Sequence, residues 1–266
     1  MDNHPKTRHD ADLMEGFLLI DKPAGMTSHD VVDRLRRFTG TKTIGHAGTL
    51  DPFATGLLLV GVGRTATREM QKLVGLDKEY QAVFVFGATS DTDDGTGKVS
   101  EGFEGLEGVE GFEARIRAAL PHFTGDIEQV PPAYAAIKIG GKKMYEAARE
   151  GKPLKTGPRR VRVYTFDLLP IPSTLPALPT LPTFPFHIAC SSGTYIRALA
   201  RDLGAALGIG AYVQELRRTK IGPFSSTNAV PLNTLSFEPW KKFAIPVQNI
   251  LSAVLSETPA SAILKQ

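Results

Sequence analysis

GHAGTLDPFATG, residues 45–56, is the stretch that says most about the fold and the chemistry of this chain. Its glycines allow close approach of the backbone, and Pro52 fixes the chain directly after Asp51. A buried strand is expected to follow at residues 57–63, so the loop should hold the Asp51 carboxylate rigidly, as a nucleophile or base requires. A second interpretation stays open: Asp51 caps the loop by accepting hydrogen bonds from backbone N–H groups.

The segments around this loop predict an α+β fold. Upstream, a short apolar strand and a Pro/Gly turn within residues 16–28 lead into a helix that ends at Gly40, with Ser28 or Thr27 as its cap. Residues 41–56 are expected to be a loop. Strands and helices then follow without regular alternation, which favours a mixed, mostly antiparallel sheet flanked by helices. The further elements are expected at 65–73 (helix), 78–87 (strand), 112–125 (helix), 130–151 (strand, Gly-Gly turn, basic helix), 159–169 (strand), 186–208 (strand, turn, helix), 211–224 (strand) and 247–255 (helix).

Two further segments are predicted from composition. Residues 1–15 are polar and are expected to form a mobile tail. Residues 169–185 hold six prolines and no charge, four of the prolines falling at every third position, so an extended polyproline insert is expected there. We interpret this insert as a passive linker, with a docking site for a partner as the alternative.

Charge and cysteine content restrict the class of protein. The formal net charge of the 266 residues is only +3, yet residues 138–162 hold nine Lys or Arg and two acids, whereas residues 91–113 hold eight acids and one Lys. Such segregation predicts one face for a polyanion and another turned away from it. Cys190 is the only cysteine, which excludes an internal disulfide, and neither a signal peptide nor a membrane span is present, so a cytoplasmic protein is expected. DTDDGTG (91–97) begins like a calcium loop but has glycine at two ligand positions.

Residues 45–56 resemble the signature loop of TruB-type pseudouridine-55 synthases. The resemblance extends in order through most of the chain, from about residue 16 to residue 225. The further matching segments are LLIDKPAGMTSHDVV (18–32), DKEYQAVFVFGATSDTDDGTG (77–97), IEQVPPAYAAIKIGGKKMYEAAREG (127–151), CSSGTYIRALARDLGAALG (190–208) and LRRTKIGPF (216–224). The resemblance implies the pseudouridine synthase catalytic fold over residues 16–266, with an RNA-gripping thumb at 127–155. Family members usually carry a C-terminal RNA-binding domain of the PUA type, which we expect to be absent here.

The resemblance also implies a role for individual residues. Asp51 would be the nucleophile, and Arg197 would pair with it. Tyr80 would stack on the flipped uracil. The residues that would contact the substrate in other ways are His46, which fills the place that the uridine vacates, Tyr195, Leu216, and Lys22 in a supporting position. From the basic segment, Lys138, Lys142, Lys143, Arg159 and Arg160 are expected to meet the RNA backbone.

The implied reaction is the isomerisation of uridine 55 in the T loop of tRNA. The N1–C1′ bond breaks and the base rejoins through C5, with the carboxylate attacking either C1′ or C6. We expect no metal, nucleotide or redox cofactor, no membrane partner, no guide RNA, and a monomer that binds the T arm of tRNA. Two other functions stay open: a guide-dependent synthase for rRNA, and a non-catalytic module that helps tRNA to fold.

Overall fold

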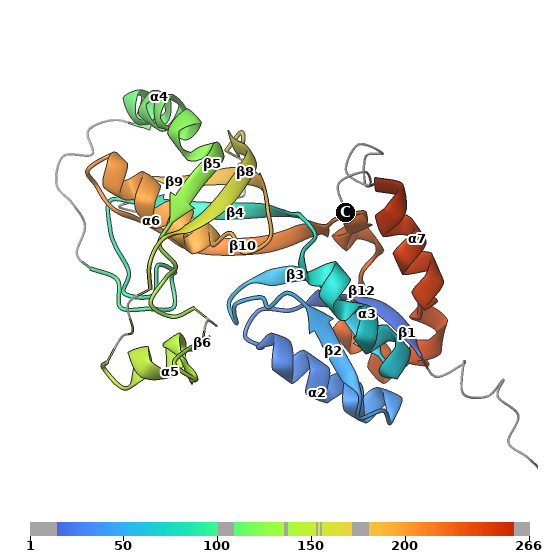
Figure 1. Cartoon of the computed structure of the whole chain (residues 1–266). Helices are drawn as coiled ribbons and strands as arrows, with labels where there is room; N and C mark the ends of the chain where they lie inside the picture. Colours follow the sequence, from blue (N-terminus) through green and yellow to red (C-terminus); the bar gives the residue numbers. More distant parts are fainter. Residues whose placement is uncertain are drawn as a thin grey trace, which may run out of the picture. The chain divides into compact units, whose positions relative to one another are not determined.

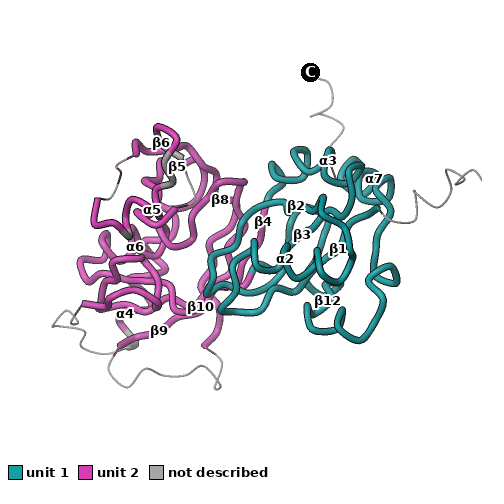
Figure 2. The backbone as a smooth tube through the Cα atoms, turned by 90° about the horizontal axis from the view of Figure 1, so that it is seen from below, with its two compact units in different colours: residues 1–77, 218–266 teal, residues 78–217 magenta. Residues whose placement is uncertain are grey.

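The computed structural model of the chain describes residues 15–100, 109–135, 138–152, 154, 156–171 and 181–257. These residues form two compact units. Unit 1 comprises residues 1–77 and 218–266, and unit 2 comprises residues 78–217 (Figure 2, teal and magenta). The boundary at residues 217 and 218 falls inside strand β10 (Ala211–Ile221). Each unit is described below by itself.

Unit 1 is built on a small sheet around two long strands. β1 (Gly16–Lys22) pairs antiparallel with β3 (Thr55–Val62), from Gly16 opposite Val62 to Lys22 opposite Gly56. β2 (Ile44–Ala47) adds to β3 in the antiparallel sense, and β12 (Val230–Pro231) adds to β1 in the parallel sense. The short strand β11 (Phe224–Ser225) folds back on the end of β10.

Both faces of this sheet are covered (Figure 1). Because successive side chains of a strand point to opposite faces, the apolar run of β1 supplies two cores. Leu18 and Ile20 pack with α2 (Ser28–Thr39) and with the 3-10 turns η3 (Leu232–Ser236) and η4 (Trp240–Phe243). Phe17 and Leu19 pack with α3 (Arg64–Val74) and α7 (Val247–Glu257). The loop 45–56, which carries Asp51, therefore adjoins a sheet that is buried on both faces.

Helices α2 and α3 of unit 1 begin in different ways. Thr27 accepts a hydrogen bond from the Asp30 amide, while the Asp30 carboxylate accepts one from the Thr27 amide, so α2 starts with a capping box. Helix α3 has Gly63 at its N-cap and no cap of its own. The carboxylate of Glu15 instead accepts hydrogen bonds from the first two amides of α3, at 2.9 and 2.8 Å. A residue from the start of the chain thus completes a helix that begins at residue 64.

Unit 2 contains an antiparallel sheet in the order β10-β4-β9-β8-β5. Its strands are β4 (Lys78–Phe86), β9 (Thr183–Cys190), β8 (Arg159–Leu168), β5 (Gly125–Gln129) and the first part of β10. Phenylalanines of β4, β8 and β9 form an aromatic cluster, which Phe112 of α4 (Val109–Ala119) closes. The other elements are the 3-10 turn η1 (Leu120–Phe123), the hairpin of β6 (Lys138–Ile139) and β7 (Lys142–Lys143), α5 (Met144–Arg149) and α6 (Ile196–Ala206).

The predicted α+β class with a mixed, mostly antiparallel sheet is confirmed, whereas several local predictions are wrong. Residues 44–47 form strand β2 where a loop was expected, because they add to the edge of β3. The helix expected at 112–125 starts earlier and ends at Ala119, where Pro121 permits only a 3-10 turn. The proline segment 169–185 ends in strand, since β9 begins at Thr183, and residues 172–180 lie outside the described part of the chain, as do residues 1–14 of the expected tail.

Candidate active site

Asp51 lies in the turn between β2 and β3, and the residues on both sides of it are anchored. The Ser28 hydroxyl bonds both the amide and the carbonyl of Leu50, at 2.9 and 3.2 Å. On the other side, the Gly25 amide donates to the Pro52 carbonyl at 2.9 Å. The Ala54 amide closes the turn by donating to the Asp51 carbonyl. The half-buried Asp51 side chain therefore projects from a backbone that is fixed at each end.

Lys22 is a buried cation directly beneath this turn. Its ammonium donates to three backbone carbonyls, those of Pro23 at 2.8 Å, Met26 at 2.7 Å and Pro52 at 3.2 Å. Its side chain has no exposed surface, and burial lowers its pKa to about 8, partly opposed by the negative charge of Asp51. Lys22 thus joins the end of β1 to the Asp51 turn, and its supporting role toward the substrate stays a prediction.

Arg218 is a second buried cation that sequence reasoning missed. Its side chain donates from Nε to the Leu57 carbonyl at 2.8 Å and from Nη2 to the Gly48 carbonyl at 3.0 Å. It therefore joins the two arms of the loop 45–56. Gly56 allows this approach, since a Cβ at that position would lie 2.3 Å from the Arg218 carbonyl oxygen. The segment LRRTKIGPF contains two consecutive arginines, and only the strand alternation decides that Arg218 is the buried one.

His46 lies on strand β2, opposite Val60 of β3. Burial lowers the pKa of its imidazole, and the positive charge of Arg218 lowers it further. At neutral pH the ring is consequently neutral, which suits a side chain that is expected to occupy the place of an uncharged base.

Arg197 is the second residue of α6 and is almost fully buried in unit 2. Its Nη1 donates to the Thr92 carbonyl at 2.8 Å and lies 3.4 Å from Oδ2 of Asp94, and its Nη2 donates to the Tyr134 carbonyl at 3.3 Å. Asp94 is itself fixed by hydrogen bonds from the amide and hydroxyl of Thr96. The pairing of Arg197 with Asp51 stays a prediction, because these residues belong to different units.

The remaining substrate candidates of unit 2 are held by the sheet. Tyr80 is a mostly buried residue of β4 opposite Ile188, and Leu216 is a mostly buried residue of β10. Tyr195 is the N-cap of α6, and its amide and carbonyl are both bonded by the side chain of Gln129, at 2.8 and 3.0 Å. Gln129, at the end of β5, was missed because a lone amide carries no chemical signal in the sequence.

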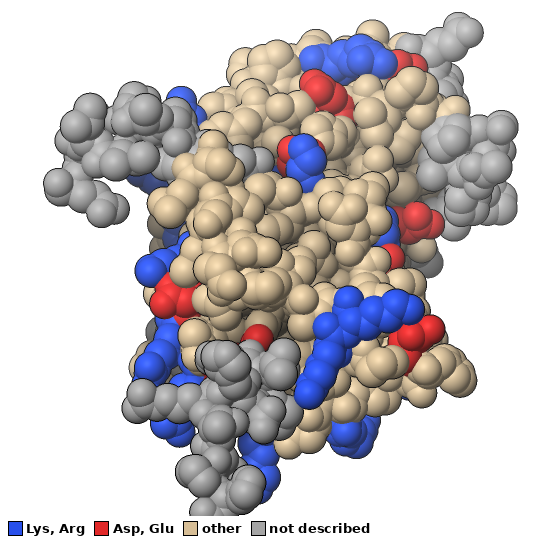
Figure 3. Space-filling model, turned by 90° about the vertical axis from the view of Figure 1, so that its right-hand side faces the viewer, with Lys and Arg blue, Asp and Glu red and all other residues tan. Residues whose placement is uncertain are grey.

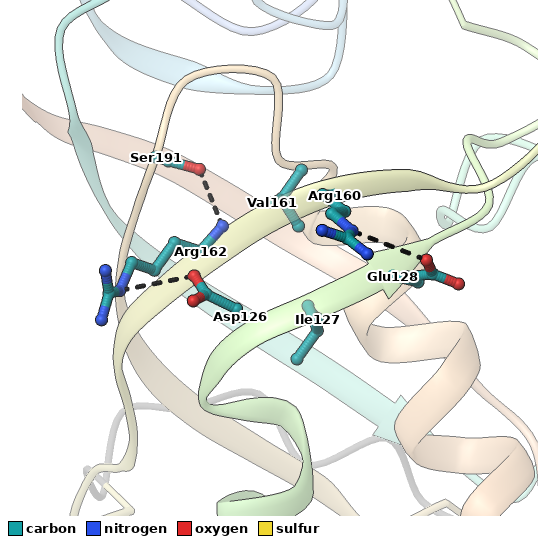
Figure 4. Close-up of a pocket in the computed structure, with 7 residues that line it drawn as sticks. All are labelled: Asp126, Ile127, Glu128, Arg160, Val161, Arg162 and Ser191. Carbon is teal, nitrogen blue, oxygen red and sulfur yellow. Dashed lines mark hydrogen bonds and ion pairs between the residues drawn. The ribbon is translucent and has the colours of Figure 1, made fainter.

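The predicted RNA-backbone residues fall on two elements of unit 2. Lys138, Lys142 and Lys143 belong to the β6–β7 hairpin, where Lys138 is opposite Lys143. Arg159 and Arg160 begin β8 and are exposed. Arg160 lines a surface hollow of about 590 Å³ beside β5, in which its Nε lies 3.9 Å from Glu128 (Figure 4).

The hollow beside β5 carries both signs of charge. Its lining residues are Asp126, Ile127, Glu128, Arg160, Val161, Arg162 and Ser191. Two arginines face two carboxylates there, so the hollow has no net positive charge (Figure 4). On the face shown in Figure 3, the basic side chains drawn in colour stand in separate groups with acidic ones nearby. Because the arginines and carboxylates inside the hollow balance each other, we assign no polyanion site to it.

Within residues 15–257, gaps excepted, no three His, Cys, Asp or Glu side chains come together in a way that fits a metal ion. In the same residues no helix has both the length and the apolar character that spanning a bilayer would need.

Two family models match this chain. Residues 36–196 match the family model described as TruB family pseudouridylate synthase, N-terminal domain. Residues 197–256, which comprise α6, β10 and the segment through α7, match the model for the tRNA pseudouridylate synthase B C-terminal domain.

Curated relatives match over most of their own length. The tRNA pseudouridine synthase B of Mycobacterium sp. (strain KMS) is 44% identical over 93% of this chain and 81% of the relative. That of Opitutus terrae is 42% identical over 91% of this chain and 97% of the relative.

Solved structures give the same fold. A Cbf5-Nop10-Gar1 complex contains a chain that is similar to this one with a TM-score of 0.66 and 26% identity, over 95% of this chain and 68% of that one. An H/ACA RNP bound to a substrate RNA containing 2′-deoxyuridine gives 0.64 and 25%, with the same coverage.

Proposed function

This chain belongs to the TruB family of pseudouridylate synthases, and we propose that it converts uridine 55 in the T loop of tRNA to pseudouridine. The observation that carries the proposal is the anchored turn around Asp51. Catalysis by a nucleophile requires a side chain held in one place before substrate arrives. Bonds from Ser28, Gly25 and Lys22 to the neighbouring residues supply that rigidity.

In the proposed reaction the target uridine leaves the base stack and enters the active site. Asp51 attacks C1′ or C6 as an ionised carboxylate, the N1–C1′ bond breaks, and the turned uracil rejoins C1′ through C5. The bond to Asp51 then breaks and releases the carboxylate, C5 loses its proton, and N1 gains one. Tyr80 stacks on the extruded base, with Leu216 and Tyr195 shaping its pocket. Neutral His46 takes the vacated place in the RNA. Arg197 supports the charge of Asp51.

The grip on the substrate is proposed to come from the thumb. Lys138, Lys142 and Lys143 of the β6–β7 hairpin, with Arg159 and Arg160, would neutralise phosphates of the T arm. We propose that the units together form one catalytic domain over residues 16–266, acting as a cytoplasmic monomer without a guide RNA. The curated relatives named for tRNA modification favour this over a guide-dependent synthase.

The test uses purified full-length protein, an unmodified tRNA transcript and no other RNA. Pseudouridine is then mapped by position. We expect it at position 55 alone, and none in a transcript that carries cytidine there. Asp51→Asn should abolish the product while tRNA binding stays within about tenfold, or roughly 1.4 kcal/mol.

Pseudouridine at other positions, or a requirement for a second RNA, would replace this proposal with a guide-dependent one. Tight tRNA binding with no product from the wild-type chain would favour a folding module. Measurable turnover by Asp51→Asn would remove Asp51 as the nucleophile.

A further inference from the structure

Arg201 makes three polar contacts one helical turn after Arg197. Its Nη1 lies 3.1 Å from Oδ2 of Asp93, its Nη2 donates to the Val130 carbonyl at 2.8 Å, and its Nε bonds Asp202 at 2.9 Å. The first contact reaches the loop 90–97, the second reaches the segment after β5, and both lie in unit 2. Arg201 therefore ties two separate segments to α6.

Arg197 and Arg201 bind the same two segments in the same manner. Arg197 takes Asp94 from the loop 90–97 and the Tyr134 carbonyl from the segment after β5. Arg201 bonds Asp93, the residue before Asp94, and the carbonyl of Val130, four residues before Tyr134. The two arginines form parallel cross-links, since residues four apart lie on one helix face.

Asp93 is held in an unfavourable backbone conformation. Its φ is +60°, and among the residues that the structure describes it is the only non-glycine with a positive φ. An L-residue pays a steric penalty there. The conformation is fixed by bonds from the Asp93 amide to the Ser90 carbonyl and from the Val213 amide to the Asp93 carbonyl, both 3.1 Å. Backbone strain of this kind persists only where the surroundings impose it.

The carboxylate of Asp93 is also largely removed from solvent, which is unfavourable for a charged group. Only 14% of its side chain is exposed. Burial raises its pKa above the ordinary value, although Arg201 and Arg197 act in the opposite direction. Neither the backbone nor the ionised side chain of Asp93 is thus arranged to maximise stability, which points to a positioning role.

The contacts made by the two sequence neighbours of Asp93 show which side chain Asp93 positions. The two groups of the loop that Nη1 of Arg197 contacts are the Thr92 carbonyl and the Asp94 carboxylate, the immediate neighbours of Asp93. A change in the Asp93 backbone would move both at once. We propose that Arg201 and Asp93 are positioning residues, which hold the loop 90–97 so that Arg197 stays aligned. This inference rests on the proposed function, because Arg197 acts there.

The test measures single-turnover pseudouridine formation at saturating tRNA for Arg201→Met and Asp93→Asn. Asparagine accepts the left-handed conformation, so Asp93→Asn removes the charge and keeps the backbone. We expect the rate to fall ten- to hundredfold in each, with tRNA affinity unchanged, since misalignment in an active site has effects of this size. Arg201→Lys should recover part of the rate.

Arg115→Met is the matched control. Arg115 also bonds a backbone carbonyl in unit 2, that of Leu207 at the end of α6, and it is exposed. This substitution should leave the rate unchanged. If Arg201→Met fails to fold by circular dichroism, Asp93→Asn alone decides.

A double-substitution cycle separates positioning from general damage. In an Arg197→Lys background, Arg201→Met should lower the rate much less than in the wild type, because the residue it aligns has already been altered. An equal loss in both backgrounds, or a wild-type rate for Asp93→Asn, overturns the inference. A wild-type chain that forms no pseudouridine on tRNA would instead overturn the proposed function.

Discussion

Replacing Lys22 with Met tests whether a buried, positively charged side chain supports the turn that carries Asp51. The pKa of Lys22 falls from its ordinary 10.5 to about 8 in the folded protein. Between these values the unfolded chain binds a proton that the folded chain does not, so stability rises with pH across this window. A shift of this size corresponds to about 3 kcal/mol, at about 1.4 kcal/mol for each pH unit.

The difference in stability between the wild type and Lys22→Met at neutral pH is less informative than the change of that difference with pH. The substitution leaves the carbonyls of Pro23, Met26 and Pro52 without their ammonium donor, at about 1–3 kcal/mol each. It also removes the cost of burying a charge, about 3 kcal/mol, which opposes the summed loss at the three carbonyls.

The assay is urea unfolding of the wild type and Lys22→Met at intervals from pH 7 to pH 10.5. Other groups titrate alike in both proteins, so subtraction isolates Lys22. We expect the stability of the wild type relative to the variant to grow by about 3 kcal/mol over the range. In an Asp51→Asn background the rise should begin at lower pH, because Asp51 favours the charged lysine. A difference that stays flat with pH would refute the buried charge.

Three further predictions concern a glycine of the Asp51 loop, the start of α3 and the thumb. Gly56→Ala should destabilise the protein by more than about 2 kcal/mol in urea unfolding, because its Cβ would lie 2.3 Å from a backbone oxygen of β10, whereas Gly25→Ala, also at positive φ but with open space, should have a smaller effect. Glu15→Gln should lower the free energy of unfolding by about 0.5–2 kcal/mol at neutral pH. Burial alone would raise the pKa of Glu15, but the hydrogen bonds that Glu15 accepts from α3 lower it overall. The difference in stability between wild type and variant should therefore disappear as the pH falls through the pKa of Glu15. Replacing Lys142 and Lys143 with Gln should reduce the log–log salt slope of tRNA binding by up to about two units, and an unchanged slope would show that the thumb does not hold phosphates.

The parts of the fold that were predictable carry strong local signals. Helix α2 has Thr27 before it and Gly40 after it, and β8 alternates polar and apolar residues from Arg159. Strand β2 has no such signal, because four residues that include a glycine gain strand structure only from the neighbouring β3. Likewise, the bonds that join Phe17 to Ile245 depend on tertiary packing.

The candidate site shows the same division. A recognisable motif identified Asp51, Tyr80 and Arg197 as chemical groups. Arg218 bonds the loop 45–56 and Gln129 bonds Tyr195 through backbone carbonyls and amides, and no spacing in the sequence records such contacts. The chemical roles are therefore predictions from the resemblance, whereas the backbone contacts that fix the loop are visible only in the structure.

The division of unit 1 between the two ends of the chain has a consequence for the order of events on the ribosome. Unit 2 is continuous, from residue 78 to residue 217, and can fold as soon as it emerges, since domains generally fold as units during synthesis. Unit 1 must wait for its second part. Arg218 bonds Gly48, and Ile245 pairs with Phe17 of β1, only after the chain has been made through residue 245. We therefore expect the nascent chain to complete the loop 45–56 after unit 2 has folded.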